Sequence, residues 1–256
     1  MKLWVLMENT ALDGFESEHG LSLYLQTAGL RILFDAGQSD AFARNAEKLG
    51  LDLGKVDLAI LSHGHYDHSG GLRHFLELNN HAPIYLSRHA FDPHFNANGK
   101  NIGIDPALSS CDRLIFVEEA ITIAPGLSLS PLDISTCPYP IDSAGLKTAA
   151  GTPEDFRHEL YLQIREGDKR ILISGCSHKG ILNIAAHFTP DILIGGFHFK
   201  HLPPSDPQLI AAAEELRRHP TTYYTGHCTG CGQFDTMKPI LANRLMAIHA
   251  GNVFEY

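Results

Sequence analysis

The stretch Ser62-His63-Gly64-His65-Tyr66-Asp67-His68 is the most informative part of this chain. Three imidazoles and a carboxylate follow directly after the apolar run Leu58–Leu61. Neutral imidazole and carboxylate are the usual ligands of zinc and similar metals. Packing rarely needs such a set, because buried polar groups are costly unless they are paired or bound to metal. The stretch therefore predicts a metal site at the end of a strand, and its spacing argues against a His-rich surface loop.

The composition is that of an ordinary globular chain and disfavours some classes of partner. Its 256 residues suffice for one large domain or two small ones, and the hydrophobic (44%) and charged (19%) fractions are ordinary. The net charge of −9 disfavours nucleic-acid binding, which needs clustered Lys and Arg. No run is long enough to span a bilayer, so no membrane partner is expected. A small anionic substrate held by a few local cations is compatible with this charge.

The N-terminus and the cysteines predict a cytoplasmic protein. Residues 1–7 are apolar but lack the longer core and the cleavage site of a secretory signal, and they are predicted to form the first strand. The five cysteines are odd in number and widely scattered, in a chain too large to need disulfides. This usage indicates reduced thiols.

Strand-like runs and helical periods alternate along the chain. Strands are expected at 2–7, 21–27, 31–34, 58–61, 84–87, 113–117, 127–130, 160–165, 170–174 and 192–195, and helices at 40–49, 70–78, 180–187, 207–219 and 238–247. This order predicts an α/β (α+β) chain with two sheets packed face to face and helices outside. Residues 88–112 and 131–158 look irregular, and we expect these loops to shape the substrate mouth.

Several motifs resemble those of the metallo-β-lactamase superfamily. The pattern His-x-His-x-Asp-His is present in residues 63–68. Leu33–Gly37 resembles the early Asp-Gly turn of the superfamily, and Ile171–Cys176 resembles the later strand that normally ends in a metal-bridging Asp. Tyr224–His227 resembles the last His motif. Three short stretches, Glu18–Gly20, Gly175–His178 and Gly226–Gly230, narrow the resemblance to the dihydropterin ribofuranosyl-aminobenzene phosphate synthase-like branch.

The resemblance implies both a fold and an activity. The fold is a four-layer αββα sandwich that forms a single domain over residues 1–256, in two similar halves with a boundary near 125–140. The activity is that of a metal-dependent hydrolase, or a related transferase, which uses metal-activated water on a small-molecule ester, phosphoester or pterin-like substrate. The implied cofactor is zinc, as one or two ions, and manganese or iron would also serve.

The resemblance also implies which residues bind the metal. His63 and His65 serve one ion, and Asp67 and His68 serve its neighbour. His227 completes the second ion, because it stands in a Gly-flanked turn after a strand-like run. Asp67 is in addition assigned a catalytic role.

The remaining ligand and catalytic positions have more than one candidate residue or role. His178, just after the later strand, is favoured as a ligand, with His158 as the alternative. Cys176 stands where the family has its bridging Asp, so it either binds metal as a thiolate or is a small buried apolar residue. His198, where a strand ends, is assigned a catalytic role in orienting the substrate or donating a proton, and His19 is a second candidate of that kind.

Asp35 and the Cys228–Cys231 stretch have structural interpretations. Asp35 is expected to support a ligand His rather than to bind metal. The stretch Cys228-Thr229-Gly230-Cys231 can be a redox pair, half of a structural zinc site, or a tight turn that holds His227. No second Cys pair stands at zinc-finger spacing, which favours the turn.

Other functions on the same scaffold fit less well. A flavodiiron-like redox enzyme usually carries Glu at the position of His65 and needs a flavin domain, for which the length leaves no room. The intact motif argues against a non-catalytic metal- or ligand-binding protein. The acidic charge argues against a nuclease.

Overall fold

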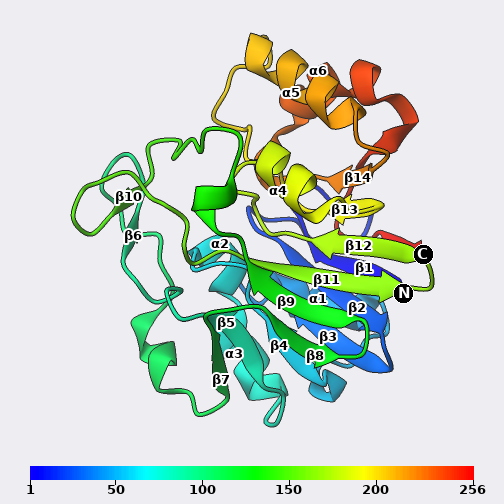
Figure 1. Cartoon of the computed structure of the whole chain (residues 1–256). Coiled ribbons are helices and arrows are strands. Elements are labelled where there is room, and N and C mark those ends of the chain that lie inside the picture. The colour runs from blue at the N-terminus through cyan, green and yellow to red at the C-terminus, as the bar shows by residue number, and fades with distance from the viewer.

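The computed structural model describes residues 1–256 as two seven-stranded sheets with helices outside (Figure 1). The first sheet has the order β16 (Val253–Glu255), β1 (Lys2–Met7), β2 (Ser22–Thr27), β3 (Leu30–Phe34), β4 (Leu58–Ile60), β5 (Ile84–Ser87) and β7 (Leu114–Val117). The second has the order β15 (Leu245–Ala247), β14 (Thr222–Thr225), β13 (Ile192–Ile194), β12 (Lys169–Ile173), β11 (Leu160–Glu166), β9 (Leu127–Pro131) and β8 (Ile121–Ala124). A small third sheet pairs β6 (His94–Phe95) with β10 (Lys147–Thr148).

Six α-helices and five short 3₁₀ turns complete the chain. The α-helices are α1 (Ala41–Lys48), α2 (Tyr66–Ser69), α3 (Leu72–Leu78), α4 (Ile181–Phe188), α5 (Pro207–Arg217) and α6 (Cys231–Leu241). The 3₁₀ turns are η1 (Leu53–Lys55), η2 (Pro106–Ser110), η3 (Ile134–Thr136), η4 (His227–Thr229) and η5 (Ala242–Arg244). No helix is both long enough and apolar enough to cross a membrane.

Three apolar clusters hold the four layers together. The central cluster joins the two sheets, with Leu25 and Ile32 from the first and Leu162 and Ile173 from the second. A second cluster fills the space between the first sheet and the helices α1 and α3, and a third lies between the second sheet and the helices α4, α5 and α6. Strands buried on both faces are continuously apolar, as β13 is, and the buried part of β12, Ile171–Ile173, is apolar too. The predicted αββα sandwich is therefore confirmed.

Strand direction brings the polar motifs to one edge. The strands β3, β4, β5 and β7 are parallel, and so are β12, β13, β14 and β15. Open parallel sheets bind their ligands beyond the carboxyl ends of the strands. Predicted positions follow five such strand ends. They are Asp35 after β3, the 62–68 stretch after β4, Cys176 and His178 after β12, His198 after β13, and His227 after β14.

One predicted helix is wrong. Residues 238–247 were expected to be helical, but α6 begins at Cys231 and ends at Leu241, and Leu245–Ala247 form the strand β15. The apolar run of β15 pairs in parallel with β14, and this tertiary contact overrides its helical period.

The predicted irregular segments and the boundary between halves differ in detail from the structure. The two irregular segments contribute β6 and β10, which pair with each other, and are otherwise loops and short turns. The chain passes from the first sheet to the second between Val117 and Ile121, slightly before the region 125–140.

Candidate metal centre

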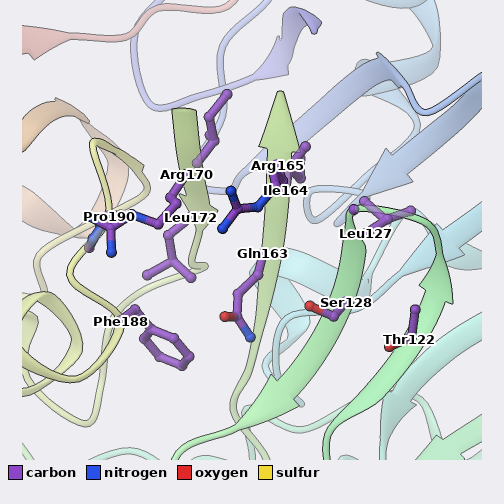
Figure 2. A pocket seen from close by; sticks show the side chains of 12 residues that line it. Thr122, Leu127, Ser128, Gln163, Ile164, Arg165, Arg170, Leu172, Phe188 and Pro190 are labelled. Atoms are coloured by element: carbon purple, nitrogen blue, oxygen red, sulfur yellow. The ribbon is translucent and has the colours of Figure 1, made fainter. Parts of the chain in front are cut away.

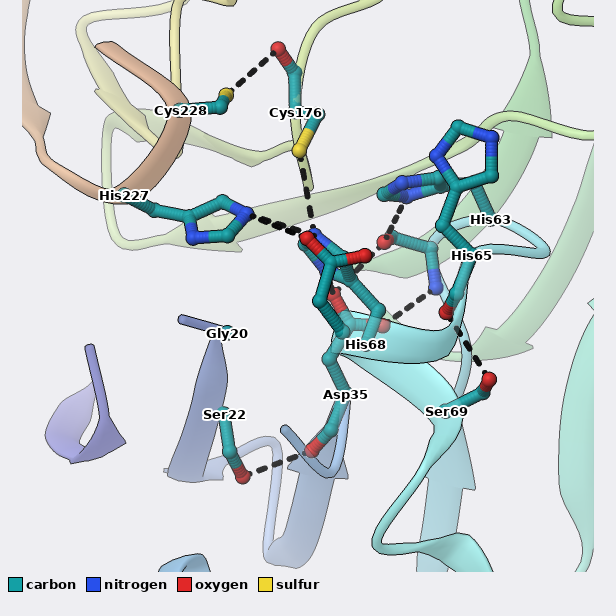
Figure 3. A network of polar contacts seen from close by, with 12 residues as sticks. Gly20, Ser22, Asp35, His63, His65, His68, Ser69, Cys176, His227 and Cys228 are labelled. Carbon is teal, nitrogen blue, oxygen red and sulfur yellow. Dashed lines mark hydrogen bonds and ion pairs between the residues drawn. The ribbon is translucent and has the colours of Figure 1, made fainter. Parts of the chain in front are cut away.

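The stretch after β4 forms the floor of the site (Figure 3). His65 is the residue before the short helix α2, which carries Asp67 and His68 in its single turn. His63 and His68 are fully buried, and Asp67 keeps 11% of its side chain exposed. The turn therefore presents several donors to the space between the two sheets.

One group of donors consists of His63, Cys176 and His178. The Nε2 atoms of His63 and His178 lie 3.2 Å apart. His63 Nδ1 lies 2.8 Å from Ser62 Oγ, and that hydroxyl donates in turn to Asp35 at 2.7 Å. The hydroxyl therefore accepts the Nδ1 proton of His63, which leaves the lone pair of Nε2 facing His178.

A second group consists of His68, Cys176 and His227. His68 Nε2 lies 3.1 Å from His227 Nε2 and 3.2 Å from Cys176 Sγ. His68 Nδ1 contacts Asp35 Oδ2 at 2.7 Å, which is the supporting contact expected of Asp35. His227 Nδ1 contacts Asn9 Oδ1 at 2.9 Å. Both rings thus use Nδ1 to bond the protein and turn Nε2 inward.

Asp67 joins the second group to His19. Its Oδ2 atom lies 3.2 Å from His19 Nε2 and 3.3 Å from His227 Nε2. The ring of His19 stacks on that of His227, with centroids 4.9 Å apart. Burial raises the pKa of Asp67, but its contacts with His19 and His227 outweigh burial and hold this pKa well below its usual range. Asp67 is therefore a carboxylate at neutral pH.

These residues fit a zinc ion. Two nitrogens bound to one tetrahedral zinc lie roughly 3.3 Å apart, as follows from zinc–nitrogen bonds of about 2.05 Å. The two inward Nε2 pairs match that spacing at 3.2 and 3.1 Å. Burial keeps the pKa values of His63 and His178 well below their usual range, so both rings are neutral, as metal ligands must be. Nδ1 contacts of the kind seen here orient metal-binding imidazoles in many proteins.

The two alternatives His178 and His158 lie in different surroundings. His178 lies against His63, as described above, whereas His158 Nδ1 accepts a hydrogen bond from the Gly64 N–H at 2.8 Å. The ring centroid of His65 is 4.7 Å from that of His63 and 4.8 Å from that of His178, so His65 borders the first group. His65 also belongs to a separate group with His94 and His158, and its buried Nε2 atom has no hydrogen-bond partner.

The cysteines near the site differ in burial. Cys176 is buried between the two groups, and burial raises the pKa of its thiol well above the usual value. Cys228 is buried beside it, and its Sγ atom donates to the Cys176 carbonyl oxygen at 3.4 Å. Cys231 is exposed at the start of α6. The Cys228–Cys231 stretch is therefore a turn, with His227 at φ 50° and Gly230 at φ 84°, as favoured from the sequence.

His198 lies where two pockets meet. Its ring centroid is 4.1 Å from that of His178, and both of its ring nitrogens are buried without a hydrogen-bond partner. One pocket, of 370 Å³, opens over the donor groups and is also lined by Asp67 and Lys200. The second, of 480 Å³, is more apolar and includes Tyr139.

Another pocket is unsuited to metal chemistry. It has a volume of 240 Å³ and lies at β9, β11 and β12 (Figure 2). Gln163, Arg165 and Phe188 are among its lining residues, and the lining contains no His, Cys, Asp or Glu. The candidate site is therefore the first of the three pockets, over the donor groups.

Four residues of the site were missed by the sequence analysis: Glu8, Asn9, His94 and Glu154. Glu8 accepts a hydrogen bond from the backbone N–H of His227, next to the Asn9 contact described above. Both follow β1, which ends at the same edge as β3, because each strand is antiparallel to β2. The position of Glu8 and Asn9 directly after a predicted strand is therefore a signal that could have identified them. His94 and Glu154 lie in the irregular segments, where no periodicity marks them.

Zinc affinity should depend on pH through His68. Burial lowers the pKa of this ring, but the Asp35 carboxylate outweighs burial and raises it to about 9. A zinc ion bound at His68 would therefore have to displace the Nε2 proton of the charged ring below pH 9. We expect the apparent zinc dissociation constant to fall about tenfold per pH unit from pH 7 to 9 and to level off above. Chelator competition at each pH measures it, and a constant affinity over this range would contradict the assignment of His68.

Comparisons with known proteins agree with this geometry. The metallo-beta-lactamase superfamily model matches residues 18–227. The crystal structure of Tm1679, a metal-dependent hydrolase of the beta-lactamase superfamily, is 31% identical over 100% of this chain and 99% of that chain, with a TM-score of 0.82. The chain therefore belongs to the metallo-β-lactamase superfamily. This membership confirms the predicted class of enzyme, a metal-dependent hydrolase.

Two proteins of Methanocaldococcus jannaschii are also similar over nearly their whole lengths. One is an uncharacterized protein, 28% identical over 97% of this chain and 98% of the relative. The other is a 7,8-dihydropterin-6-methyl-4-(beta-D-ribofuranosyl)-aminobenzene-5'-phosphate synthase, 26% identical over 100% of this chain and 97% of the relative. The predicted resemblance to that branch is thereby confirmed as a distant one.

Proposed function

We propose that this protein is a cytoplasmic, zinc-dependent hydrolase that cleaves a phosphoester of a small organic molecule. The observation that carries the proposal is the inward orientation of the Nε2 atoms of His63, His68 and His227, each fixed by a hydrogen bond at Nδ1. Zinc in such a site lowers the pKa of water to about 7 and so supplies a nucleophile at neutral pH. All five cysteines are unpaired, which supports a reducing compartment.

The donor atoms favour zinc over harder metals. The proposed ligands are His63, His65 and His178 for one ion, and Asp67, His68 and His227 for the other. Cys176 Sγ lies in both groups, and thiolate with imidazole suits zinc, whereas manganese and magnesium prefer oxygen. Iron accepts the same donors, so metal analysis separates the two.

Two residues are proposed to handle protons. Asp67, an ionised carboxylate at the pocket floor, accepts a hydrogen bond from the attacking water and orients it. His198 lines the same pocket with both ring nitrogens free of protein partners, so it is placed to donate a proton to the leaving oxygen.

The lining of the pocket favours an anionic substrate. Lys200 and His201 line it together with His198, in a chain whose net charge is −9. A cation such as Lys200, together with imidazole N–H donors, stabilises a phosphoryl group more than it stabilises a neutral ester. The substrate is therefore proposed to be a phosphoester rather than a carboxylic ester, and no nucleic-acid or membrane partner is proposed.

A related transferase acting on a pterin-like compound is the second candidate. The apolar pocket beside the site is lined by the aromatic residues Tyr139, Phe197 and Phe199 and shares His178 and His198 with the first pocket. A flat ring bound there would place its substituents near the donor groups. The name of the second Methanocaldococcus jannaschii relative is consistent with such a substrate.

Metal analysis and a substrate panel test the proposal. Purified protein should contain zinc and should hydrolyse phosphodiesters or phosphomonoesters faster than thioesters or lactones. His65→Ala should lower zinc content and turnover together, whereas the exposed His81→Ala should change neither. Iron with redox activity and no hydrolysis would support the flavodiiron-like alternative. Bound metal without turnover on any class would support a binding protein.

A further inference from the structure

A buried polar group outside the proposed ligand set borders His65. It consists of His94, Glu154 and His158, whose exposed fractions are 2%, 6% and 0%. One ring nitrogen from each of His65, His94 and His158 lies within 4.8 Å of those of the other two, and the Nε2 atom of each ring is buried without a hydrogen-bond partner. Buried polar atoms without partners call for an explanation in terms of function.

Three converging imidazoles resemble a further zinc site, but the hydrogen bonds of His158 argue against one. The Gly64 N–H donates to His158 Nδ1 at 2.8 Å, so this nitrogen carries the lone pair. A ring that accepts a hydrogen bond at Nδ1 has no proton there, so it is the neutral imidazole. A neutral imidazole has one N–H, which must then be at Nε2. A protonated Nε2 is a donor and does not bind metal.

His94 carries its proton on the other ring nitrogen from His158. Its Nδ1 atom lies 3.0 Å from Glu154 Oε2, and both side chains are buried. A carboxylate accepts, so Nδ1 carries the proton and His94 Nε2 presents a lone pair towards His65. The rings of His94 and His65 meet edge to face with centroids 5.4 Å apart, so their two unpartnered Nε2 atoms can be joined through one water molecule.

We propose that His94 and Glu154 are positioning residues that fix the tautomer of His65. Glu154 holds the proton of His94 on Nδ1, and His94 in turn holds the proton of His65 on Nε2. The lone pair of His65 is then on Nδ1, the nitrogen left to face His63 and His178. The inference rests on the proposed metal site and adds the residues that orient one of its ligands.

The surroundings of His94 support a built arrangement. Gly64 lies against it, and a Cβ atom at Gly64 would be 3.0 Å from His94 Nε2 and 2.1 Å from the Ala90 carbonyl oxygen. His94 belongs to β6, and its partner in the small sheet is Thr148 of β10. The two irregular segments thus meet at this sheet and deliver His94 and Glu154 to the metal ligand.

Zinc affinity of matched variants tests the proposal. His94→Phe keeps the ring volume but removes the acceptor, and should weaken zinc binding about 10- to 100-fold in chelator competition. His94→Gln keeps an acceptor oxygen near the place of Nε2 and should restore most of the affinity. His89→Phe is the control, because His89 forms the same kind of pair with Asp92, at 3.0 Å, on the surface. It should change affinity less than about twofold, as a surface pair does.

Nitrogen NMR of the zinc-loaded protein provides a second readout that needs no variant. His65 should carry its proton on Nε2 and its metal on Nδ1. Zinc on Nε2, or an unchanged zinc affinity in folded His94→Phe, would overturn the proposal. If His94→Phe does not fold, Glu154→Leu replaces it with the same expected loss, and unchanged affinity there would also overturn it. Zinc binding without turnover on any substrate would contradict the proposed function but leave this inference intact.

Discussion

Asp67→Asn should lower kcat on the best phosphoester substrate by about 10²- to 10⁴-fold, the range that a positioned proton acceptor contributes. The amide keeps the size of the side chain but removes the charge that His19 and His227 contact at 3.2 and 3.3 Å. An amide is also a poorer zinc ligand than a carboxylate, so zinc content should fall with kcat.

The control for this variant is Asp168→Asn, at an exposed turn between β11 and β12. It should leave both kcat and zinc content unchanged. Steady-state kinetics with metal analysis of the same samples measures the two effects together. A kcat within about twofold of wild type in zinc-loaded Asp67→Asn would remove Asp67 from the chemistry, because a loss of that size is below the range of acid–base catalysis.

Asp35→Ala should destabilise the zinc-free protein by about 3–5 kcal/mol, the usual cost of removing one partner of a buried ion pair. Asp35 is buried and accepts hydrogen bonds from the Ser62 N–H, the Ser62 hydroxyl and His68 Nδ1, all at 2.7 Å. His68 carries a proton at neutral pH, because its pKa is about 9. The variant therefore leaves a buried cation and two donors without their acceptor.

Urea unfolding of the zinc-free protein measures this loss. Asp40→Ala is the comparison, because its ion pair with Arg44 is half exposed and contributes about 0–1 kcal/mol at most. Asp35→Ala should also lose zinc, since His68 would no longer be oriented. A loss of free energy of unfolding as small as that of Asp40→Ala would contradict the role assigned to Asp35.

The order of the elements explains why much of the site could be predicted. A motif placed after a buried strand lies at the carboxyl end of that strand, and parallel strands bring such ends together. The prediction of His63, His68, His178 and His227 as one site rests on the family resemblance, and this rule explains why the fold brings them to one edge. The same rule applied to β1 would have added Glu8 and Asn9.

The rest of the site depends on contacts that no local pattern encodes. His94 and Glu154 meet because two irregular segments pair as β6 and β10, and neither segment has a period. The proposed tautomer of His65 depends on the hydrogen bond between His94 and Glu154, and both of these residues are distant from His65 in the sequence. The segment 238–247 was misassigned for a similar reason, because the pairing of β15 with β14 decides its conformation.

Anomalous scattering from crystals grown with zinc, recorded above and below the zinc edge, tests the metal centre most directly. The account predicts zinc peaks in contact with Nε2 of His63 and His178 and with Nε2 of His68 and His227. Absence of any peak there, or a single ion held by the Nε2 atoms of His65, His94 and His158 instead, would contradict it.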